Sequence, residues 1–153
     1  MTKPIKFILS VLLLILVVNQ SIAQENTAVN QVNQNTIVDT YYKLNVKAFQ
    51  ANSTIEDINR IFKLFTDDFT YVHPKYGGTY TRDDLYQGYI RNQKNGMYNG
   101  TITDVKIFSR ITGVNAIAVK RIYIDNEIKE EKDAKMTLFE FKEGKISKIF
   151  EYW

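Results

Sequence analysis

Residues 65–78 read Phe65-Thr-Asp-Asp-Phe-Thr-Tyr-Val-His-Pro-Lys-Tyr-Gly-Gly78, and this stretch decides the order of helices and strands. The segment from Phe69 to His73 is short, aromatic and β-branched, so it is typical of a strand. Pro74 ends the strand because proline lacks the N–H group that a β-ladder needs, and the two glycines mark a turn. His73, the only histidine of the chain, therefore lies at the end of a strand.

Two helices are expected before this strand and one after it. Apolar residues recur at helical spacing from Thr36 onward. Ser53 or Thr54 can cap a second helix, whose apolar face extends to Phe65. The segment Thr81-Arg-Asp-Asp84 is typical of the capped start of a third helix.

Alternating apolar and polar residues follow, and they predict four strands joined by short turns. The predicted strands cover residues 101–111, 115–124, 130–141 and 145–153. Turns of this length connect antiparallel neighbours. The complete order, ααβαββββ, predicts an α+β domain in which three helices pack on one face of a curved, cone-shaped antiparallel sheet.

The first 35 residues are expected to lie outside that domain. Lys3 and Lys6 precede a short apolar run that ends in small residues, which predicts a signal peptide over residues 1–23. A retained membrane anchor is the alternative. Residues 24–35 are rich in Asn and Gln and indicate a disordered tether. The domain is assigned to residues 36–153, and the protein is expected to be exported, to the periplasm or outside the cell.

Charge and metal-ligand content exclude several classes of protein. Removing residues 1–23 takes away two lysines and no acids, so the formal charge falls from +3 to +1. The remaining basic residues are scattered among acids, which argues against nucleic-acid binding and against stable membrane association. One histidine and no cysteine are too few ligands for a zinc site, and there is no phosphate-binding glycine loop. We therefore expect no metal and no cofactor.

The order of these segments resembles the nuclear transport factor 2-like superfamily over residues 36–153. The resemblance is carried by Phe65-Thr-Asp-Asp-Phe69, Val72-His-Pro74, Thr81-Arg-Asp-Asp-Leu85 and Gly144-Lys-Ile-Ser-Lys-Ile-Phe-Glu-Tyr-Trp153. Within the superfamily the chain looks most like the SnoaL-like and ketosteroid-isomerase-like branch. The resemblance implies a mostly apolar pocket between the helices and the concave face of the sheet, and a homodimer.

The same resemblance implies roles for individual positions. His73 falls where ketosteroid isomerases carry the aspartate that acts as general base. Their second acid aligns with Thr137, and their tyrosine aligns near Asn45, although Tyr41 or Tyr42 can still reach the pocket. Because the isomerase site is not intact, steroid isomerisation is not expected.

Alternation along the strands indicates which side chains face the pocket, because residues two apart on a strand share a face. The inward rows combine aromatic rings with a few polar groups, which suits a small, partly apolar ligand. The candidate pocket residues are Tyr71, His73, Val119, Arg121, Tyr123, Thr137, Phe139, Ile149, Glu151 and Trp153.

Each polar candidate also has a structural interpretation. His73 is the candidate catalytic base because its unperturbed pKa lies near neutrality, but it can equally bond to backbone at the strand end. Arg121 and Glu151 can position His73 or the ligand, or can simply pair across the sheet. The tyrosines around the Gly77-Gly78 turn can gate the pocket or pack as ordinary aromatic residues.

Three classes of function remain. The first is a cofactor-independent lyase, isomerase or cyclase in which His73 removes a proton next to a carbonyl group. The second is a binding module for a small apolar molecule, and the third is an interaction or dimerisation domain with a vestigial pocket. The sequence favours ligand binding, with proton transfer as an additional activity, and leaves open whether the chain is an enzyme.

Overall fold

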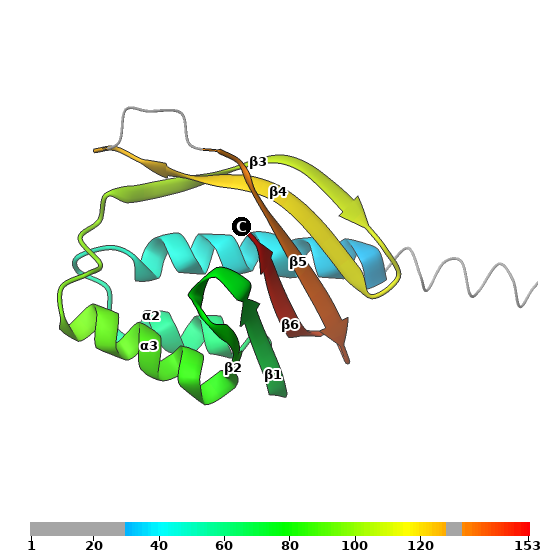
Figure 1. Ribbon diagram of the computed structural model, residues 1–153, viewed down its shortest axis with the longest axis horizontal. Coiled ribbons are helices and arrows are strands. Elements are labelled where there is room, and N and C mark those ends of the chain that lie inside the picture. Colours follow the sequence, from blue (N-terminus) through cyan, green and yellow to red (C-terminus); the bar gives the residue numbers. More distant parts are fainter. Residues whose placement is uncertain (1–29, 128–132) are drawn as a thin grey trace, which may run out of the picture.

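A curved six-stranded sheet forms one wall of the molecule, and the helices lie on one of its faces (Figure 1). The computed structural model describes residues 30–127 and 133–153, and residues 30–48 form a long helix. The other elements are α2 (Ile55–Phe62), β1 (Phe65–His73), a 3₁₀ turn (Pro74–Tyr76), β2 (Gly78–Thr81), α3 (Arg82–Lys94), β3 (Ile102–Thr112), β4 (Ala116–Asp125), β5 (Lys135–Lys142) and β6 (Lys145–Tyr152). The strands lie in the order β2-β1-β6-β5-β4-β3.

The predicted α+β class is confirmed, with two differences in the sheet. Strand β2 was not predicted, because four residues beginning with glycine carry too short an alternation to be recognised. Strand β1 pairs antiparallel with β2 but parallel with β6. The sheet is therefore mixed rather than antiparallel, and β1, which ends in His73, has a neighbour on both sides.

Capping boxes fix the residues at which α2 and α3 begin. The Thr54 hydroxyl accepts from the backbone N–H of Asp57, and the Asp57 carboxylate accepts from the Thr54 N–H at 2.9 Å. Thr81 and Asp84 repeat this arrangement at α3. Each box satisfies N–H groups that have no partner within the helix. Both predicted helix starts are confirmed, with Thr54 rather than Ser53 as the cap.

Phe65 begins β1 instead of extending the second helix. Its ring stacks on that of Phe69, with centroids 4.0 Å apart, and both rings are buried. Residues four apart share a face in a strand as they do in a helix, so the spacing of these two rings does not distinguish the two structures. Phe65 also follows the buried Phe62 of α2 at helical spacing, which is why the helical prediction extended too far.

The folded part of the chain also begins earlier than predicted. Residues 30–35 are helical, although their composition indicated a tether. Gln34 is buried and donates a hydrogen bond to the carbonyl of Val114 at 3.1 Å, in the turn between β3 and β4. The predicted signal peptide and tether residues 24–29 lie outside the described residues. None of the described helices is long and apolar enough to cross a membrane.

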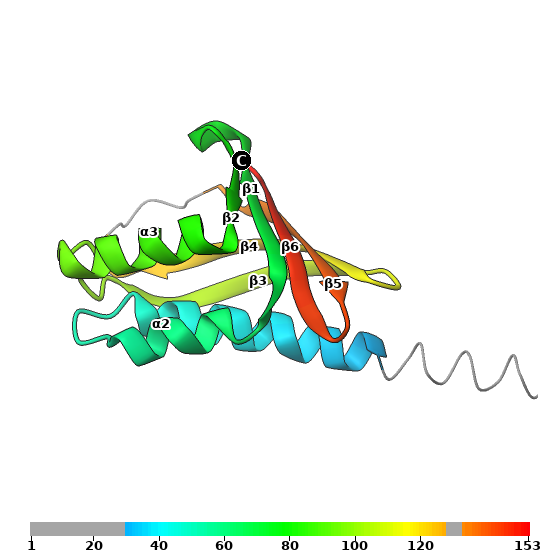
Figure 2. The same cartoon turned by 90° about the horizontal axis from the view of Figure 1, so that it is seen from below.

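The core lies where the long helix packs against the inner face of β4, β5 and β6. The rings of Tyr41 and Tyr42 lie edge-on to Phe139, with centroids 5.3 and 5.7 Å apart. Both views show α2 and α3 gathered near one end of the long helix, away from the β3–β4 turn (Figure 2). The inner face is therefore closed by the long helix toward that turn, and α3 approaches it at the opposite end.

Candidate functional site

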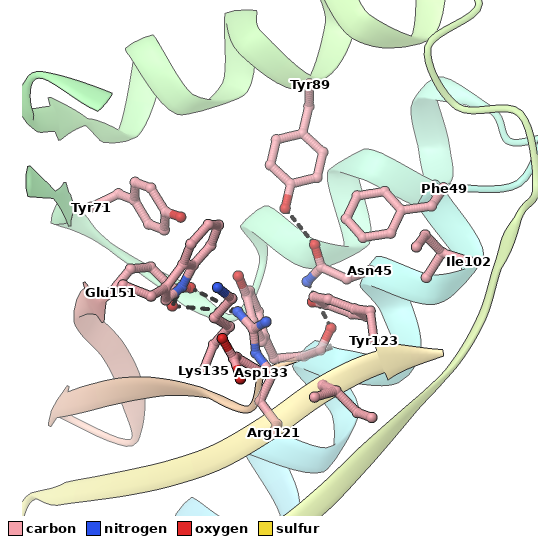
Figure 3. Close-up of a pocket in the computed structure, with 13 residues that line it drawn as sticks. Asn45, Phe49, Tyr71, Tyr89, Ile102, Arg121, Tyr123, Asp133, Lys135 and Glu151 are labelled. Carbon is pink, nitrogen blue, oxygen red and sulfur yellow. Dashed lines mark hydrogen bonds and ion pairs between the residues drawn. The ribbon is translucent and has the colours of Figure 1, made fainter. Parts of the chain in front are cut away.

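Two adjoining cavities lie between the inner face of the sheet, the long helix and α3. Their volumes are about 330 and 480 Å³. Five side chains line both cavities: Tyr41, Phe49, Tyr71, Tyr89 and Trp153. We call the two cavities together the hollow. Figure 3 shows Tyr71 and Tyr89 reaching into the first cavity from different sides, with Arg121 rising from β4.

A buried ion pair forms part of the wall of the first cavity. The Arg121 Nη2 atom lies 3.2 and 3.3 Å from the two carboxylate oxygens of Glu151, and the side chains are only 6% and 4% exposed. Glu151 also accepts hydrogen bonds from the Thr137 hydroxyl and from Nε1 of Trp153, each at 2.7 Å. Glu151 is thus held by three neighbours, which confirms the predicted pairing across the sheet.

Strand register explains why this carboxylate lies beside Thr137. Thr137 and Glu151 are direct cross-strand partners on β5 and β6, and Val119 on β4 is the other partner of Thr137. The resemblance implied an acid at position 137. The structure places a carboxylate at the hydroxyl of that threonine from the neighbouring strand, but the carboxylate is already engaged by Arg121.

The charge of Arg121 is stabilised despite its burial. Burial alone would lower its pKa, but the neighbouring Tyr123 and Glu151 outweigh that effect and hold the pKa above its ordinary value. Its guanidinium carbon lies 4.7 Å from the ring centroid of Tyr123. Arg121 therefore remains a cation at any physiological pH.

His73 lines the second cavity, and the residue is only 2% exposed. Neither ring nitrogen has a hydrogen-bond partner among the described residues. The rings of Tyr76 and Trp153 lie against it, with centroids at 4.3 and 4.4 Å. Burial lowers the pKa of His73, although Glu151 opposes part of this effect. At neutral pH the imidazole is uncharged and offers one donor and one acceptor.

A second polar group joins the long helix to α3. The Tyr89 hydroxyl donates to the side-chain oxygen of Asn45, whose amide nitrogen donates to the carbonyl of Tyr41 at 2.8 Å. Burial raises the pKa of the Tyr41 and Tyr89 phenols. These hydroxyls therefore stay protonated and can donate as well as accept hydrogen bonds. Tyr89 of α3 thus places a hydroxyl at Asn45, while Tyr41 lines both cavities, as the sequence allowed, and Tyr42 lines neither.

The structure brings together six of the ten predicted pocket residues. They are Tyr71, Arg121, Tyr123, Glu151 and Trp153 in the first cavity, and Tyr71, His73 and Trp153 in the second. The other four, Val119, Thr137, Phe139 and Ile149, line neither cavity and are fully buried. They face inward as predicted, but the long helix covers this part of the sheet, so they belong to the core.

Several lining residues were not predicted. Phe49 directly follows the long helix, and Tyr98 lies in the segment after α3, where no periodic pattern applies. Their rings approach each other to 5.2 Å. The only sequence signal for this part of the hollow is the high number of tyrosines, which does not indicate where each ring lies.

Comparison with known proteins identifies the fold. No protein-family model and no curated protein matches the chain. A nuclear transport factor 2-like protein of unknown function from Burkholderia xenovorans LB400 has 13% identity and a TM-score of 0.57, over 80% of this chain and 84% of that chain. Another from Cytophaga hutchinsonii ATCC 33406 has 14% identity and a TM-score of 0.53, over 80% and 96%.

A third similar structure is provisionally assigned as a polyketide cyclase. It comes from Sinorhizobium meliloti and has 13% identity and a TM-score of 0.53, over 76% of this chain and 94% of that chain. At these identities the similarity concerns the fold alone. Together with the element order and the curved mixed sheet, it shows that the chain has the nuclear transport factor 2-like fold.

Proposed function

We propose that this protein binds a small, partly apolar organic molecule in the hollow. The observation that carries the proposal is the pair of adjoining cavities, with volumes of about 330 and 480 Å³, whose five shared lining residues are all aromatic. Aromatic walls with a few fixed polar groups are typical of sites for small organic ligands. The provisional polyketide cyclase of the same fold is consistent with such a ligand.

Charges in the hollow favour an uncharged ligand. The first cavity is lined by two cations, Arg121 and Lys135, and by two anions, Asp133 and Glu151. The second is lined by one residue of each sign, Asp84 and Arg91. Since these charges balance, the hollow offers no net charge to attract an ion, and phenol, amide and imidazole groups remain for hydrogen bonding.

Gly88 on α3 provides a direct test, because it lines the second cavity within a helix. A Cβ atom added there would have Nη2 of Arg91, at 3.9 Å, as its nearest neighbour, so a side chain fits without disturbing the backbone. The Gly88→Leu variant places a branched side chain in the cavity and obstructs it, whereas the matched Gly88→Ala variant leaves most of it open. Both are expected to fold, since alanine and leucine favour helices by about 1 kcal/mol over glycine.

The probe is 4-hydroxyacetophenone, an uncharged ring with one hydroxyl and one carbonyl group. Saturation-transfer NMR and calorimetry should detect binding to the wild type and to Gly88→Ala. The Gly88→Leu variant should bind at least about tenfold more weakly, which is about 1.4 kcal/mol. Equal binding to all three proteins would contradict binding in the hollow.

The state of His73 favours proton transfer as a second candidate activity. Its uncharged ring lines the second cavity, and neither nitrogen has a partner among the described residues. Such an imidazole can take a proton from the carbon next to a ligand carbonyl and return it, while the carbonyl oxygen carries the charge between the two steps. In D₂O, wild-type protein should catalyse deuterium exchange at the methyl group of 4-hydroxyacetophenone. His73→Gln protein should not exceed the buffer rate, and equal rates in both proteins would exclude His73 as the base.

The outer face of the sheet supports a homodimer as an additional property. A row of apolar residues runs across five strands there, each residue paired with the next on the neighbouring strand: Ile111, Ala118, Leu138, Phe150 and Val72. No described helix covers this row, and a second copy would present the same complementary apolar surface. Sedimentation velocity should give a dimer for the wild type and a monomer for Leu138→Lys. A monomeric wild type would rule out this interface.

Export is proposed from residues 1–23 alone, whose charged start, apolar run and small residues before position 24 fit a signal peptide. Mass spectrometry of protein recovered after secretion in a bacterial host should find Gln24 at the N-terminus. A chain that retains residues 1–23 would favour the membrane-anchor alternative.

A further inference from the structure

Tyr76 covers His73 from the solvent side. The Tyr76 residue is 59% exposed, whereas the imidazole beneath it is almost fully buried, with the ring centroids 4.3 Å apart at an angle of 52°. Trp153 closes the imidazole from another side, at 4.4 Å. Both imidazole nitrogens are inaccessible to solvent and have no partner within the described part of the chain. One exposed ring thus separates a buried polar group from water.

The turn that carries Tyr76 is short and lightly attached. It is a single 3₁₀ turn, Pro74–Tyr76, followed by Gly77 and Gly78 with φ angles of 103° and 126°. A Cβ atom placed at Gly78 would meet nothing within 4 Å. The hydroxyl of Tyr80 donates to the carbonyl of Tyr76 and ties the turn to β2. The two glycines allow large backbone rotations at the base of the turn.

Two opposing effects of similar size act on the closed position of the turn, in which the Tyr76 ring covers His73. Contact between the rings of Tyr76 and His73 stabilises it. The same contact removes the imidazole nitrogens from water without giving them a partner, which destabilises it. An opening of the turn would therefore cost little free energy, because it exchanges the ring contact for hydrogen bonds to the imidazole.

We propose that the Pro74–Gly78 turn is a gate, with Tyr76 as its movable cover, which opens to expose the ring nitrogens of His73 at the second cavity. Tyr76, Tyr80 and His73 all line that cavity, so displacement of the cover enlarges it at the position of the imidazole. Tyr80 is the latch, through its hydroxyl bond to the turn. The use of the open gate by a ligand rests on the proposed function, but the movement itself can be tested without any ligand.

The chain is suited to such a test because His73 is its only histidine. Diethyl pyrocarbonate modifies uncharged imidazole, and the absorbance at 240 nm then reports a single site in the full-length protein. In the wild type at pH 7.5, modification should be slower than in N-acetylhistidine by about tenfold or more, as for a residue exposed only in a minor open state. Mass spectrometry of the peptide that contains His73 verifies the site.

Two variants and one control decide the role of Tyr76. Tyr76→Ala should raise the rate to within about threefold of N-acetylhistidine. Tyr80→Phe, which removes only a hydroxyl, should raise it by less. Tyr152→Ala removes an exposed ring from the outer face of the sheet and should leave the rate unchanged. Circular dichroism of each variant verifies that the fold is retained.

The proposal is overturned if wild-type His73 reacts as fast as N-acetylhistidine, because the cover would then not protect it. It is also overturned if Tyr76→Ala and Tyr80→Phe both react as slowly as the wild type. Failure of 4-hydroxyacetophenone to bind would contradict the proposed function and would leave these rates unaffected. The two proposals can therefore fail separately.

Discussion

Replacement of Glu151 by glutamine should destabilise the protein more than any other single change of charge in the described sheet. The variant keeps the size of the side chain and one acceptor oxygen, and because Thr137 and Trp153 both donate to Oε2 of Glu151, an amide oxygen at that position can keep both bonds. It leaves the Arg121 charge buried without a counterion. Loss of one partner from a buried ion pair costs about 3–5 kcal/mol, and we expect a loss of about 3 kcal/mol because one acceptor remains.

The measurement is urea unfolding followed by far-ultraviolet circular dichroism, with Asp68→Asn as the control. Asp68 pairs with Lys142 at 2.9 Å, but the two side chains are 63% and 56% exposed. A solvated pair contributes about 0–1 kcal/mol. Loss of the Asp68–Lys142 pair should therefore destabilise the protein less than loss of the Arg121–Glu151 pair, although its atoms lie closer together. The double variant Arg121→Met/Glu151→Leu should be more stable than Glu151→Gln, because no charge is left buried. A loss in Glu151→Gln no larger than that in Asp68→Asn would refute the reasoning.

Three further predictions concern other parts of the molecule. The pKa of His73, measured by NMR, should lie below 6.5. Because folding lowers this pKa, the contribution of His73 to the free energy of unfolding should be fully present above pH 6.5 and should be lost as the pH falls through the folded pKa. His73→Gln should remove that part of the pH dependence. Thr54→Ala should lower the free energy of unfolding by about 1 kcal/mol through loss of the α2 cap, whereas the neighbouring Ser53→Ala should cost less; equal effects would contradict the assigned cap. Phe139→Ala should cost about 3–5 kcal/mol, because the ring is fully buried against the long helix, and a cost below about 1 kcal/mol would place Phe139 outside the core.

The starts of α2 and α3 could be predicted from the sequence because a helix cap depends only on residues a few positions apart. Thr54 and Thr81 each stand three residues before an aspartate, and both form capping boxes. The parallel pairing of β1 with β6 joins residues about 80 positions apart, such as Tyr71 with Ile149, and no local pattern encodes it. Strand β2 is a different case: its partners on β1 lie only 5 to 11 positions earlier, but four residues are too few to show an alternation, so it is recognisable only through that pairing.

The candidate site was predicted in part for a similar reason. Alternation placed Arg121 and Glu151 on the inner face correctly, because the side of a strand follows from its own residues. Whether an inward residue meets open space or core depends on where a helix crosses the sheet. Val119 and Phe139 lie under the long helix, while Trp153 lies beyond it and lines the hollow.

The cross-strand pair of Thr137 and Glu151 has a consequence for comparing proteins of this fold. Two side chains opposite each other on paired strands reach almost the same point, although they are 14 positions apart in the chain. A carboxylate can therefore change its position in the sequence without changing its position in space. Alignment columns will record such an exchange as the loss of one acid and the unrelated gain of another. Searches for related sites should compare the coordinates of functional groups, irrespective of the strand that carries them.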